Sequence, residues 1–449
     1  MKRNTKNYSL TYPKIIAIGF ACIIVIGTIL LYLPISTKGD AHVPFIDALF
    51  TATSATCVAG LVPFDTYTSW SLFGQVVILC LIQIGGLGFI TIIGFVFRLI
   101  RHRASIKEKM LLKESLGALE IVNVKGLVRT VLVSTATFEL VGACILATRF
   151  IPMTESLGKG IFMALFTSIS AYCNAGFELM GFFEKSSSLV TVNNDPIILL
   201  TISLLIIAGS IGFTVWNDLS TTKYKFAKLT AHSRLVLVTT GILLVGGTVM
   251  FLFFENDKAF ADMSIWQKVL NAFFCSTTRS AGFNSIPLCN ISNPSKMLTI
   301  LLMFIGGSSG STAGGVKTTT IAILFLCVIS TIRNNEDINV FNKRIPLVFV
   351  KKAVTIVFFN LAIILFSTFI IAFLQPEFKL TDVLFECTAA ASTAGMGIGI
   401  TSQLHLIPKL LVIGMMYIGR LTSFIFVMMF VTTKAKTTSQ KPKGTIIIG

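Results

Sequence analysis

Long, uninterrupted apolar runs are the feature of this sequence that most restricts its fold. The first run, IIAIGFACIIVIGTILLYL at residues 15–33, is long enough to cross a hydrocarbon core of ~30 Å at ~1.5 Å per helical residue. Over the whole chain, 54% of residues are apolar, only 13% are charged, and the mean hydropathy is +0.83. A soluble protein carries about 25% charged residues. We therefore predict an all-α polytopic membrane protein.

The apolar runs and the charges between them predict a topology. About eight full spans are expected, at residues 14–34, 71–99, 127–149, 196–217, 235–254, 297–331, 351–374 and 406–432. Alternate connections, together with both chain ends, hold 25 of the 37 Lys and Arg residues but only six of the 20 acids. Because basic loops stay on the cytoplasmic side, we predict a cytoplasmic N-terminus (1–13) and C-terminal tail (434–449). The net charge of +17 then reflects topology and attraction to anionic lipid, and binding to nucleic acid is not expected.

Four further apolar segments are too short to cross the membrane. At about twelve residues each, they would form helices of ~18 Å, at positions 44–55, 160–171, 265–277 and 381–391. Each ends in a string of small residues: SATCVAGL (54–61), SAYCNAGF (170–177), STTRSAGF (276–283) and AAASTAGM (389–396). Non-helical backbone at membrane depth survives only where protein buries it or water reaches it. We therefore predict re-entrant pore helices whose loops line a central pore.

The order span, short helix, loop and span occurs four times. We place the four pore repeats at residues 14–99, 127–218, 235–331 and 351–433. A glycine recurs in every loop, at Gly60, Gly176, Gly282 and Gly395, with a phenylalanine ten residues before it, or nine in the third repeat. Repetition at a similar period indicates one structural unit used several times. Four units arranged around an axis would close a ring.

Such a ring suits a dehydrated monovalent cation. Rings of backbone carbonyls can replace its hydration shell, and glycine permits the backbone angles and close approach that this requires. The carboxyl ends of four inward-pointing helices would add negative potential. Hydroxyls of Thr56, Ser170, Thr277, Thr278 and Thr393 are expected to donate to the backbone behind the ring. The candidate filter comprises Val58, Ala59, Gly60, Asn174, Ala175, Gly176, Ser280, Ala281, Gly282, Thr393, Ala394 and Gly395.

The fourfold plan and the string TTRSAGF in the third repeat resemble the Trk/Ktr/HKT superfamily of potassium transporters. The resemblance covers about residues 14–433 and is greatest to the KtrB-type membrane subunits of Ktr systems. It implies channel-like potassium uptake across a bacterial plasma membrane, a homodimer, sodium dependence, and a cytoplasmic ring of RCK-domain subunits of KtrA or KtrC type. No bound cofactor is expected besides the transported K⁺ or Na⁺. The basic segment 98–114 is the expected docking face for the ring, and TIIIG (445–449) is expected at the dimer interface.

The sixth span contains the string GGSSGSTAGGVKTTT (306–320). Each glycine in a helix costs ~1 kcal/mol relative to alanine, so Gly306, Gly307, Gly310, Gly314 and Gly315 predict a break at mid-membrane. One interpretation is close helix packing through small residues. The other is a mobile loop beneath the filter that acts as a gate. The resemblance implies the gate, with Lys317 and Arg420 close to it.

Two arginines lie where the membrane makes charge costly. Arg279 stands among the filter residues, so its guanidinium is expected to point behind the filter and bond to carbonyls or to Glu386. Arg420 lies deep in the last span, where a charge costs ~2.5–3.5 kcal/mol on insertion scales. We expect Arg420 to face the pore or to pair with an acid, and Glu139 is the acid that lies clearly within a span.

Other functional classes fit the sequence less well. An ion-coupled secondary transporter would be expected to show inverted repeats and intramembrane carboxylates, whereas these repeats run in one direction. An enzyme is not expected, because the four histidines lie at span ends or in loops, and the nine cysteines do not cluster with them. A sodium-conducting member of the same superfamily remains the nearest alternative.

Overall fold

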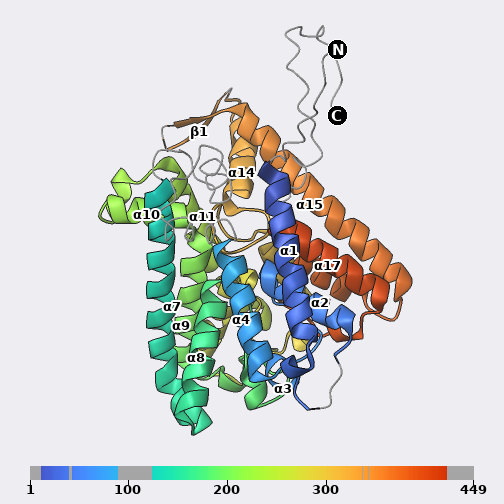
Figure 1. Cartoon of the computed structure of the whole chain (residues 1–449). Helices are drawn as coiled ribbons and strands as arrows, with labels where there is room; N and C mark the ends of the chain where they lie inside the picture. Colours follow the sequence, from blue (N-terminus) through green and yellow to red (C-terminus); the bar gives the residue numbers. More distant parts are fainter. Residues whose placement is uncertain (1–11, 40–42, 89–123, 336, 342, 422–449) are drawn as a thin grey trace, which may run out of the picture.

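The computed structural model describes residues 12–39, 43–88, 124–335, 337–341 and 343–421. Its helices form four similar sets, each with a long helix, a short helix and a second helix (Figure 1). We refer to these sets as repeats 1 to 4. The long helices are α1 (Tyr12–Tyr32), α7 (Val124–Thr154), α11 (Ala231–Glu255) and α15 (Leu347–Leu374). All four are long and apolar enough to cross a membrane.

The short helices occupy the positions predicted for the pore helices. They are α2 (Phe45–Cys57), α8 (Leu157–Tyr172), α12 (Ile265–Thr277) and α16 (Leu380–Ala391). The start of α12 is set by a capping box, in which Ser264 Oγ accepts from the Gln267 N–H and Gln267 Oε1 accepts from the Ser264 N–H. The prediction of four short helices, one after each long helix, is therefore confirmed.

The second helices are shorter than predicted. They are α4 (Leu72–Leu87), α9 (Pro196–Ile211), α13 (Asn293–Phe304) and α17 (Leu406–Arg420). The predicted continuations of α4 to residue 99 and of α17 to residue 432 lie outside the described residues. The remaining elements are α3 (Thr66–Ser69), α10 (Phe213–Thr221), α14 (Thr318–Ile332), the hairpin β1 (Ile338–Val340) and β2 (Lys343–Ile345), and seven 3₁₀ turns, η1 (Pro34–Ser36), η2 (Met180–Phe182), η3 (Val190–Val192), η4 (Phe226–Lys228), η5 (Thr278–Ser280), η6 (Leu288–Asn290) and η7 (Thr401–Gln403).

The prediction of one continuous span at 196–217 is wrong. The chain bends by 90° between α9 and α10 at Gly212, whose φ is 99°. The break frees backbone groups that need partners at membrane depth, and the segment between α13 and α14 supplies them. The Phe213 N–H donates to the Gly310 carbonyl over 2.9 Å, and the Ser308 N–H donates to the Ser210 carbonyl over 2.9 Å.

The predicted break in the sixth span is confirmed. Residues 305–317 separate α13 from α14 and form a loop that contains no helix. A short parallel bridge joins Ile305 to Val316 at its two ends. We refer to residues 305–317 as the intramembrane loop.

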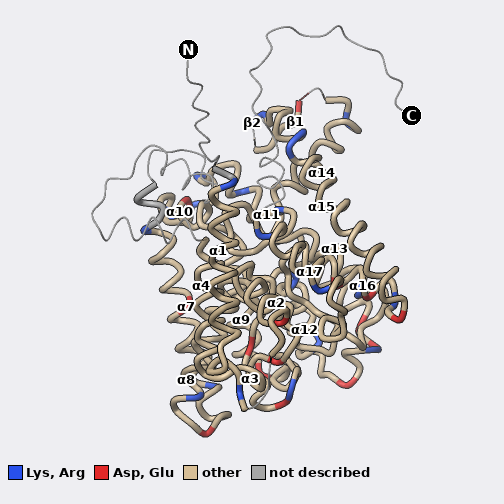
Figure 2. The backbone as a smooth tube through the Cα atoms, turned by 45° about the vertical axis from the view of Figure 1, so that its right-hand side comes forward, with Lys and Arg blue, Asp and Glu red and all other residues tan. Residues whose placement is uncertain are grey.

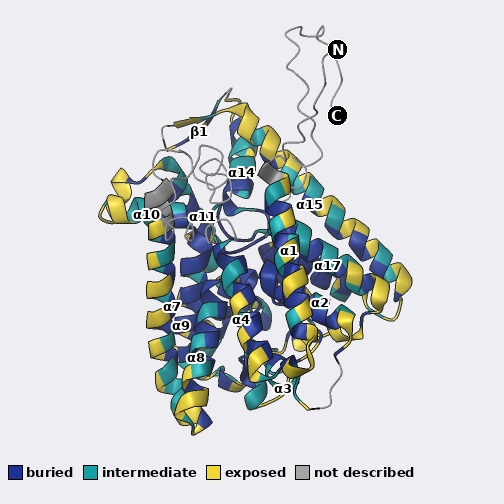
Figure 3. Cartoon of the chain, viewed as in Figure 1, coloured by how far each residue is buried: buried dark blue, intermediate teal, exposed yellow. Residues whose placement is uncertain are grey.

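Burial and charge follow the plan of a membrane protein with a packed centre. Buried residues concentrate where the short helices meet (Figure 3). Large apolar side chains point outward from the long helices, and Phe253, Phe358 and Phe373 are 82%, 74% and 77% exposed. Such side chains fit a lipid environment. Most of the described acidic residues lie in the lower half of Figure 2, toward the end of the molecule where α3 and α8 lie.

Polar contacts tie two of the second helices to the short helix of the next repeat. Lys296 of α13 pairs with Asp382 of α16 over 2.9 Å, and Lys409 of α17 pairs with Asp47 of α2 over 2.6 Å. Both pairs are largely buried. Between repeats 2 and 3, side-chain amides take this role, with Asn271 Nδ2 donating to the Asn193 carbonyl over 3.2 Å.

The Lys409–Asp47 pair should stabilise the closure of repeat 4 onto repeat 1. Lys409→Met would leave the Asp47 carboxylate buried without its partner, which costs about 3–5 kcal/mol. We expect a clear fall in the thermal unfolding temperature in detergent, and recovery of most of it in Lys409→Met/Asp47→Asn. Arg149→Met is the control, because the Arg149–Asp195 pair at 3.4 Å is more exposed and should contribute at most about 1 kcal/mol. An equal fall in unfolding temperature in Lys409→Met and Arg149→Met would contradict a stabilising role of the Lys409–Asp47 pair.

Candidate functional site

Three of the four short helices end in the same left-handed turn. The residue before the filter alanine has a positive φ in each, and the alanine N–H donates to the carbonyl five residues back. These residues are Val58 (φ 55°), Asn174 (φ 59°) and Thr393 (φ 46°), and the bonds are Ala59–Ser54 and Ala175–Ser170 at 2.7 Å and Ala394–Ala389 at 2.9 Å. A positive φ is uncommon outside glycine, and for a β-branched residue it is an outlier. The shared geometry supports the sequence alignment of repeats 1, 2 and 4.

Repeat 3 ends its short helix differently. Residues Thr278–Ser280 form a 3₁₀ turn, and the Ala281 N–H donates to the Thr278 carbonyl over 2.8 Å. No left-handed residue precedes Ala281, which accounts for the single residue missing between Phe273 and Gly282. The chain nevertheless reaches the same position by Gly282.

The four repeat glycines meet at one point. Their φ values are 74° at Gly60, 76° at Gly176, 70° at Gly282 and 76° at Gly395. A Cβ built on Gly60 would lie 3.0 Å from Gly395 Cα, one on Gly176 would lie 2.9 Å from Gly282 Cα, and one on Gly282 would lie 2.8 Å from the Gly395 carbonyl carbon. The ring closes because a Cβ on Gly60 would also overlap the Ala175 carbonyl oxygen. Each repeat thus adjoins the next, and repeats 2 and 4 lie opposite each other.

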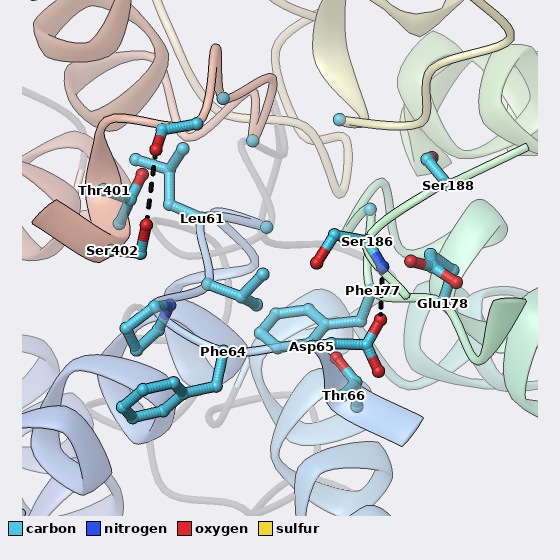
Figure 4. A pocket seen from close by; sticks show the side chains of 18 of the residues that line it. Leu61, Phe64, Asp65, Thr66, Phe177, Glu178, Ser186, Ser188, Thr401 and Ser402 are labelled. Atoms are coloured by element: carbon cyan, nitrogen blue, oxygen red, sulfur yellow. Dashed lines mark hydrogen bonds between the residues drawn. The ribbon is translucent and has the colours of Figure 1, made fainter. Parts of the chain in front are cut away.

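On one side of this ring lies a cavity of about 200 Å³, the outer vestibule. It is lined by the four repeat glycines and by polar side chains that include Asp65, Glu178 and Thr401 (Figure 4). The Asp65 carboxylate is held by N–H groups of Thr68 at 2.8 Å and Ser186 at 2.9 Å. The Asp65 carboxylate adds negative charge to the wall of the vestibule, which favours cations.

On the other side of the ring lies the intramembrane loop. Thr312 Oγ1 donates to the Tyr172 carbonyl of repeat 2 over 3.1 Å and accepts from Asn174 Nδ2 over 2.7 Å. Gly314 packs on repeat 4, where a Cβ would lie 2.7 Å from the Ser392 carbonyl oxygen and overlap Thr393 Oγ1. Because repeats 2 and 4 lie opposite each other, residues 312–314 must cross the axis of the ring.

Two cationic side chains hold this crossing segment. Lys317 Nζ donates to the Ala313 carbonyl over 2.6 Å. Arg420 donates to the carbonyls of Thr312 and Gly85 and, over 3.4 Å, to that of Gly86. Arg420 thus joins the loop to α4 of repeat 1, and its position at a pore stays a prediction. It does not pair with Glu139, whose carboxylate bonds to Gln83 over 3.2 Å and contacts Cys173 Sγ at 3.9 Å.

Of the two kinds of partner predicted for Arg279, carbonyls or Glu386, the second is not found in the described structure. Arg279 is buried, at 4% exposed, but its Nη1 has no hydrogen-bond partner in the described structure. Glu386 instead accepts from the Thr401 hydroxyl and the Ile398 N–H. The Glu386 carboxylate is therefore used within repeat 4, where it holds the segment that follows the filter.

The hydroxyl groups also differ from expectation. Thr277 and Thr278 donate to their own helix, to the Phe273 carbonyl at 2.8 Å and the Cys275 carbonyl at 3.3 Å. The hydroxyls of Thr56, Ser170 and Thr393 are buried without a partner in the described structure. None of the five thus donates to the filter backbone.

Three glycines of the second helices were missed in the sequence. Gly85, Gly209 and Gly419 pack directly against carbonyl oxygens of Thr56, Tyr172 and Ala391, each four residues before the repeat glycine. A Cβ at any of them would overlap that oxygen. Their repeated position along the second helices was the signal that could have identified them.

Comparisons with known proteins agree with this geometry. A family model described as "TrkH: Cation transport protein" matches residues 4–440. The chain is 35% identical to the potassium/sodium uptake protein NtpJ of Enterococcus hirae, over 100% of this chain and 99% of that protein. It is 36% identical to the Ktr system potassium uptake protein B of Bacillus subtilis, over 98% and 97%. The crystal structure of the potassium transporter TrkH from Vibrio parahaemolyticus superposes with a TM-score of 0.73 at 16% identity, over 95% of this chain and 86% of that one.

Arg420 should restrain cation flux through its bonds to the loop. Arg420→Gln removes a positive charge and at least one of the bonds to the Thr312, Gly85 and Gly86 carbonyls, so we expect flux into proteoliposomes to rise. Arg420→Lys keeps the charge and should change flux less. Equal flux in all three proteins would show that Arg420 does not restrain the pore.

Proposed function

This chain belongs to the TrkH family of cation transport proteins, and we propose that it takes up potassium through a pore between its four repeats. The observation that carries the proposal is the closed ring of Gly60, Gly176, Gly282 and Gly395, with an acidic vestibule on one side and the intramembrane loop on the other. Family membership favours transport over catalysis. The names of the relatives from E. hirae and B. subtilis support potassium as the cargo, and the first of them keeps sodium as an alternative.

The filter is proposed to be formed by the backbone around the ring. In each repeat, the filter residues are the repeat glycine and the two residues before it: Val58–Gly60, Asn174–Gly176, Ser280–Gly282 and Thr393–Gly395. Carbonyl oxygens in such a ring would replace the hydration shell of the ion. Glycine lets backbones of neighbouring repeats approach to distances that a Cβ would forbid. No other cofactor is proposed, and the transported ion is the ligand of the site.

The intramembrane loop is proposed to be the gate, closed in this conformation. Residues 312–314 join opposite repeats and therefore lie across the ion path. Arg420, bonded to the Thr312 carbonyl, places a positive charge beneath the filter, where it repels a cation, and Lys317 is bonded to the neighbouring Ala313 carbonyl. The obstruction would be removed if the loop moved aside. The glycines at 306, 307, 310, 314 and 315 give the loop conformational freedom.

We also propose the membrane, the topology and the partners of this chain. The chain would lie in a bacterial plasma membrane with both ends cytoplasmic, as the distribution of basic residues suggests. A homodimer and a cytoplasmic nucleotide-binding RCK ring of KtrA or KtrC type would complete the system, with transport dependent on sodium. The segment 98–114 and the tail 445–449, expected to contact these partners, lie outside the described residues.

Potassium uptake can be tested in bacteria that lack their own uptake systems. Expression of the chain, with a partner ring, should restore growth at micromolar potassium and rubidium uptake, and added sodium should stimulate uptake. A strain that expresses the protein in its membrane but gains only sodium uptake would favour the sodium-conducting alternative. No cation uptake would reject the proposal.

Gly60 should set ion preference. In Gly60→Ser the new Cβ meets the Ala175 carbonyl and Gly395 Cα, and a non-glycine residue at a left-handed position costs ~1–2 kcal/mol. A change of ~1.4 kcal/mol in the balance between two ions alters their ratio tenfold. We expect potassium preference over sodium, measured by competition uptake, to fall more than protein abundance does. An unaltered preference would remove Gly60 from the filter.

Shortening the loop should open the pore. Deletion of residues 309–313 removes Thr312, through which the loop contacts repeat 2. It also removes the Thr312 and Ala313 carbonyls, to which Arg420 and Lys317 donate. Flux into proteoliposomes should rise, and its dependence on the partner ring should weaken. Lower or unchanged flux in a folded protein would favour the alternative that the glycines serve helix packing.

A further inference from the structure

Hydrogen bonds join the intramembrane loop directly to the candidate filter of repeat 2. The Thr312 hydroxyl accepts from Asn174 Nδ2 over 2.7 Å and donates to the Tyr172 carbonyl over 3.1 Å. Asn174 Oδ1 in turn accepts from Ser280 Oγ of repeat 3 over 3.1 Å. Thr312 and Asn174 are 0% and 1% exposed. The loop, repeat 2 and repeat 3 therefore share one buried chain of hydrogen bonds.

The directions of these bonds are mutually consistent. The Thr312 hydroxyl has one hydrogen, which goes to Tyr172, and a lone pair left to accept from Asn174. The second amide hydrogen of Asn174 can reach the Tyr172 carbonyl at 3.3 Å, and its oxygen takes the Ser280 hydroxyl. The two bonds of the Thr312 hydroxyl, to Asn174 and to Tyr172, exist only while the loop occupies this position. Separation would leave buried groups without partners, which is unfavourable.

Among the left-handed turns of the described structure, the turn of repeat 2 makes this contact and those of repeats 1 and 4 do not. At the equivalent left-handed positions, repeat 1 has Val58, which has no polar side-chain atom, and repeat 4 has Thr393, whose hydroxyl has no partner in the described structure. Asparagine also tolerates the left-handed conformation better than a β-branched residue does. The side chain of Asn174 thus combines the filter turn with a polar group that reaches the loop.

We propose, on the basis of the gate proposed above, that Thr312 is a latch. By this we mean that its hydrogen bond with Asn174 holds the closed loop against the filter and breaks when the loop opens. To let an ion pass, residues 312–314 must leave the axis, and the bonds of Thr312 to Asn174 and Tyr172 must break. Because Asn174 belongs to the filter turn, any change of that turn alters how firmly the loop closes. By reciprocity the position of the loop alters the filter turn. The gate and the filter are therefore energetically linked through one side-chain pair.

The test is a double-mutant cycle on rubidium flux into proteoliposomes. Thr312→Val keeps the shape and removes the hydroxyl, while Asn174→Gly removes the amide and keeps the left-handed backbone accessible. Each single variant should raise flux about threefold to tenfold, the range expected for one buried hydrogen bond at a factor of ten per ~1.4 kcal/mol. The double variant should exceed the larger single effect by little, because both changes break the same bond. Thr312→Ser keeps the hydroxyl and should behave like the unaltered protein.

Thr319→Val provides the matched control. Its hydroxyl lies 3.0 Å from Ser309 Oγ of the loop and makes no hydrogen bond to a filter residue in the described structure. The fold-change in flux caused by Thr319→Val should multiply with the fold-change caused by Asn174→Gly in the double variant, since the two bonds are independent. Multiplicative effects of Thr312→Val and Asn174→Gly, or unchanged flux in Thr312→Val, would overturn the latch.

Ion preference separates a latch from a permanent brace. A latch is released in the conducting state, so Thr312→Val should leave the ratio of potassium to sodium uptake unchanged while flux rises. A changed ratio would mean that Thr312 still shapes the conducting filter, and the latch would be rejected. If the unaltered protein carries no potassium, the proposed function fails. If it carries potassium but the cycle shows no coupling, the latch alone fails.

Discussion

The need to satisfy backbone polar groups inside the membrane governs the whole structure. Hydrocarbon offers no hydrogen bonds, so a chain that leaves the helical conformation at this depth must find partners in protein or in a water-filled cavity. The four re-entrant loops meet this need by packing on one another around the glycine ring. The break at Gly212 meets it differently, because the intramembrane loop supplies the groups that Phe213 and Ser210 lack. The intramembrane loop thus makes the break at Gly212 possible.

Close backbone approach is the second requirement, and glycine meets it at two levels. The repeat glycines bring four loops together at the axis, while Gly85, Gly209 and Gly419 bring the second helices against the ends of the short helices. Buried ion pairs such as Lys296–Asp382 then join neighbouring repeats farther out. The loops are consequently held from behind as well as from the sides. This support keeps the four loops in place around the axis.

The sequence predicted the features that depend on local composition and on repetition. The short helices could be located because an apolar segment of about twelve residues cannot span the bilayer, and the break at 305–317 because glycines accumulate there. Contacts between distant segments could not be predicted. The partner of Glu386 is Thr401 and not Arg279, the bend at Gly212 depends on Gly310, and the bond from Asn174 to Thr312 joins residues 138 positions apart. A glycine in an apolar helix indicates that another segment approaches its backbone closely, but it does not identify that segment.

The four repeats differ most where the loop meets them, and this asymmetry has a physical reason. A single loop cannot contact four identical surfaces equally, so the repeats that hold it must be distinguishable at the ends of their short helices. Repeat 2 offers the amide of Asn174, repeat 4 offers a surface where Gly314 fits, and repeat 3 has a shorter turn from which Ser280 reaches Asn174. Around the ring itself the backbone stays nearly fourfold, with φ between 70° and 76° at all four glycines. Symmetry is therefore kept at the glycine ring and abandoned two to four residues before each glycine, where the loop is held.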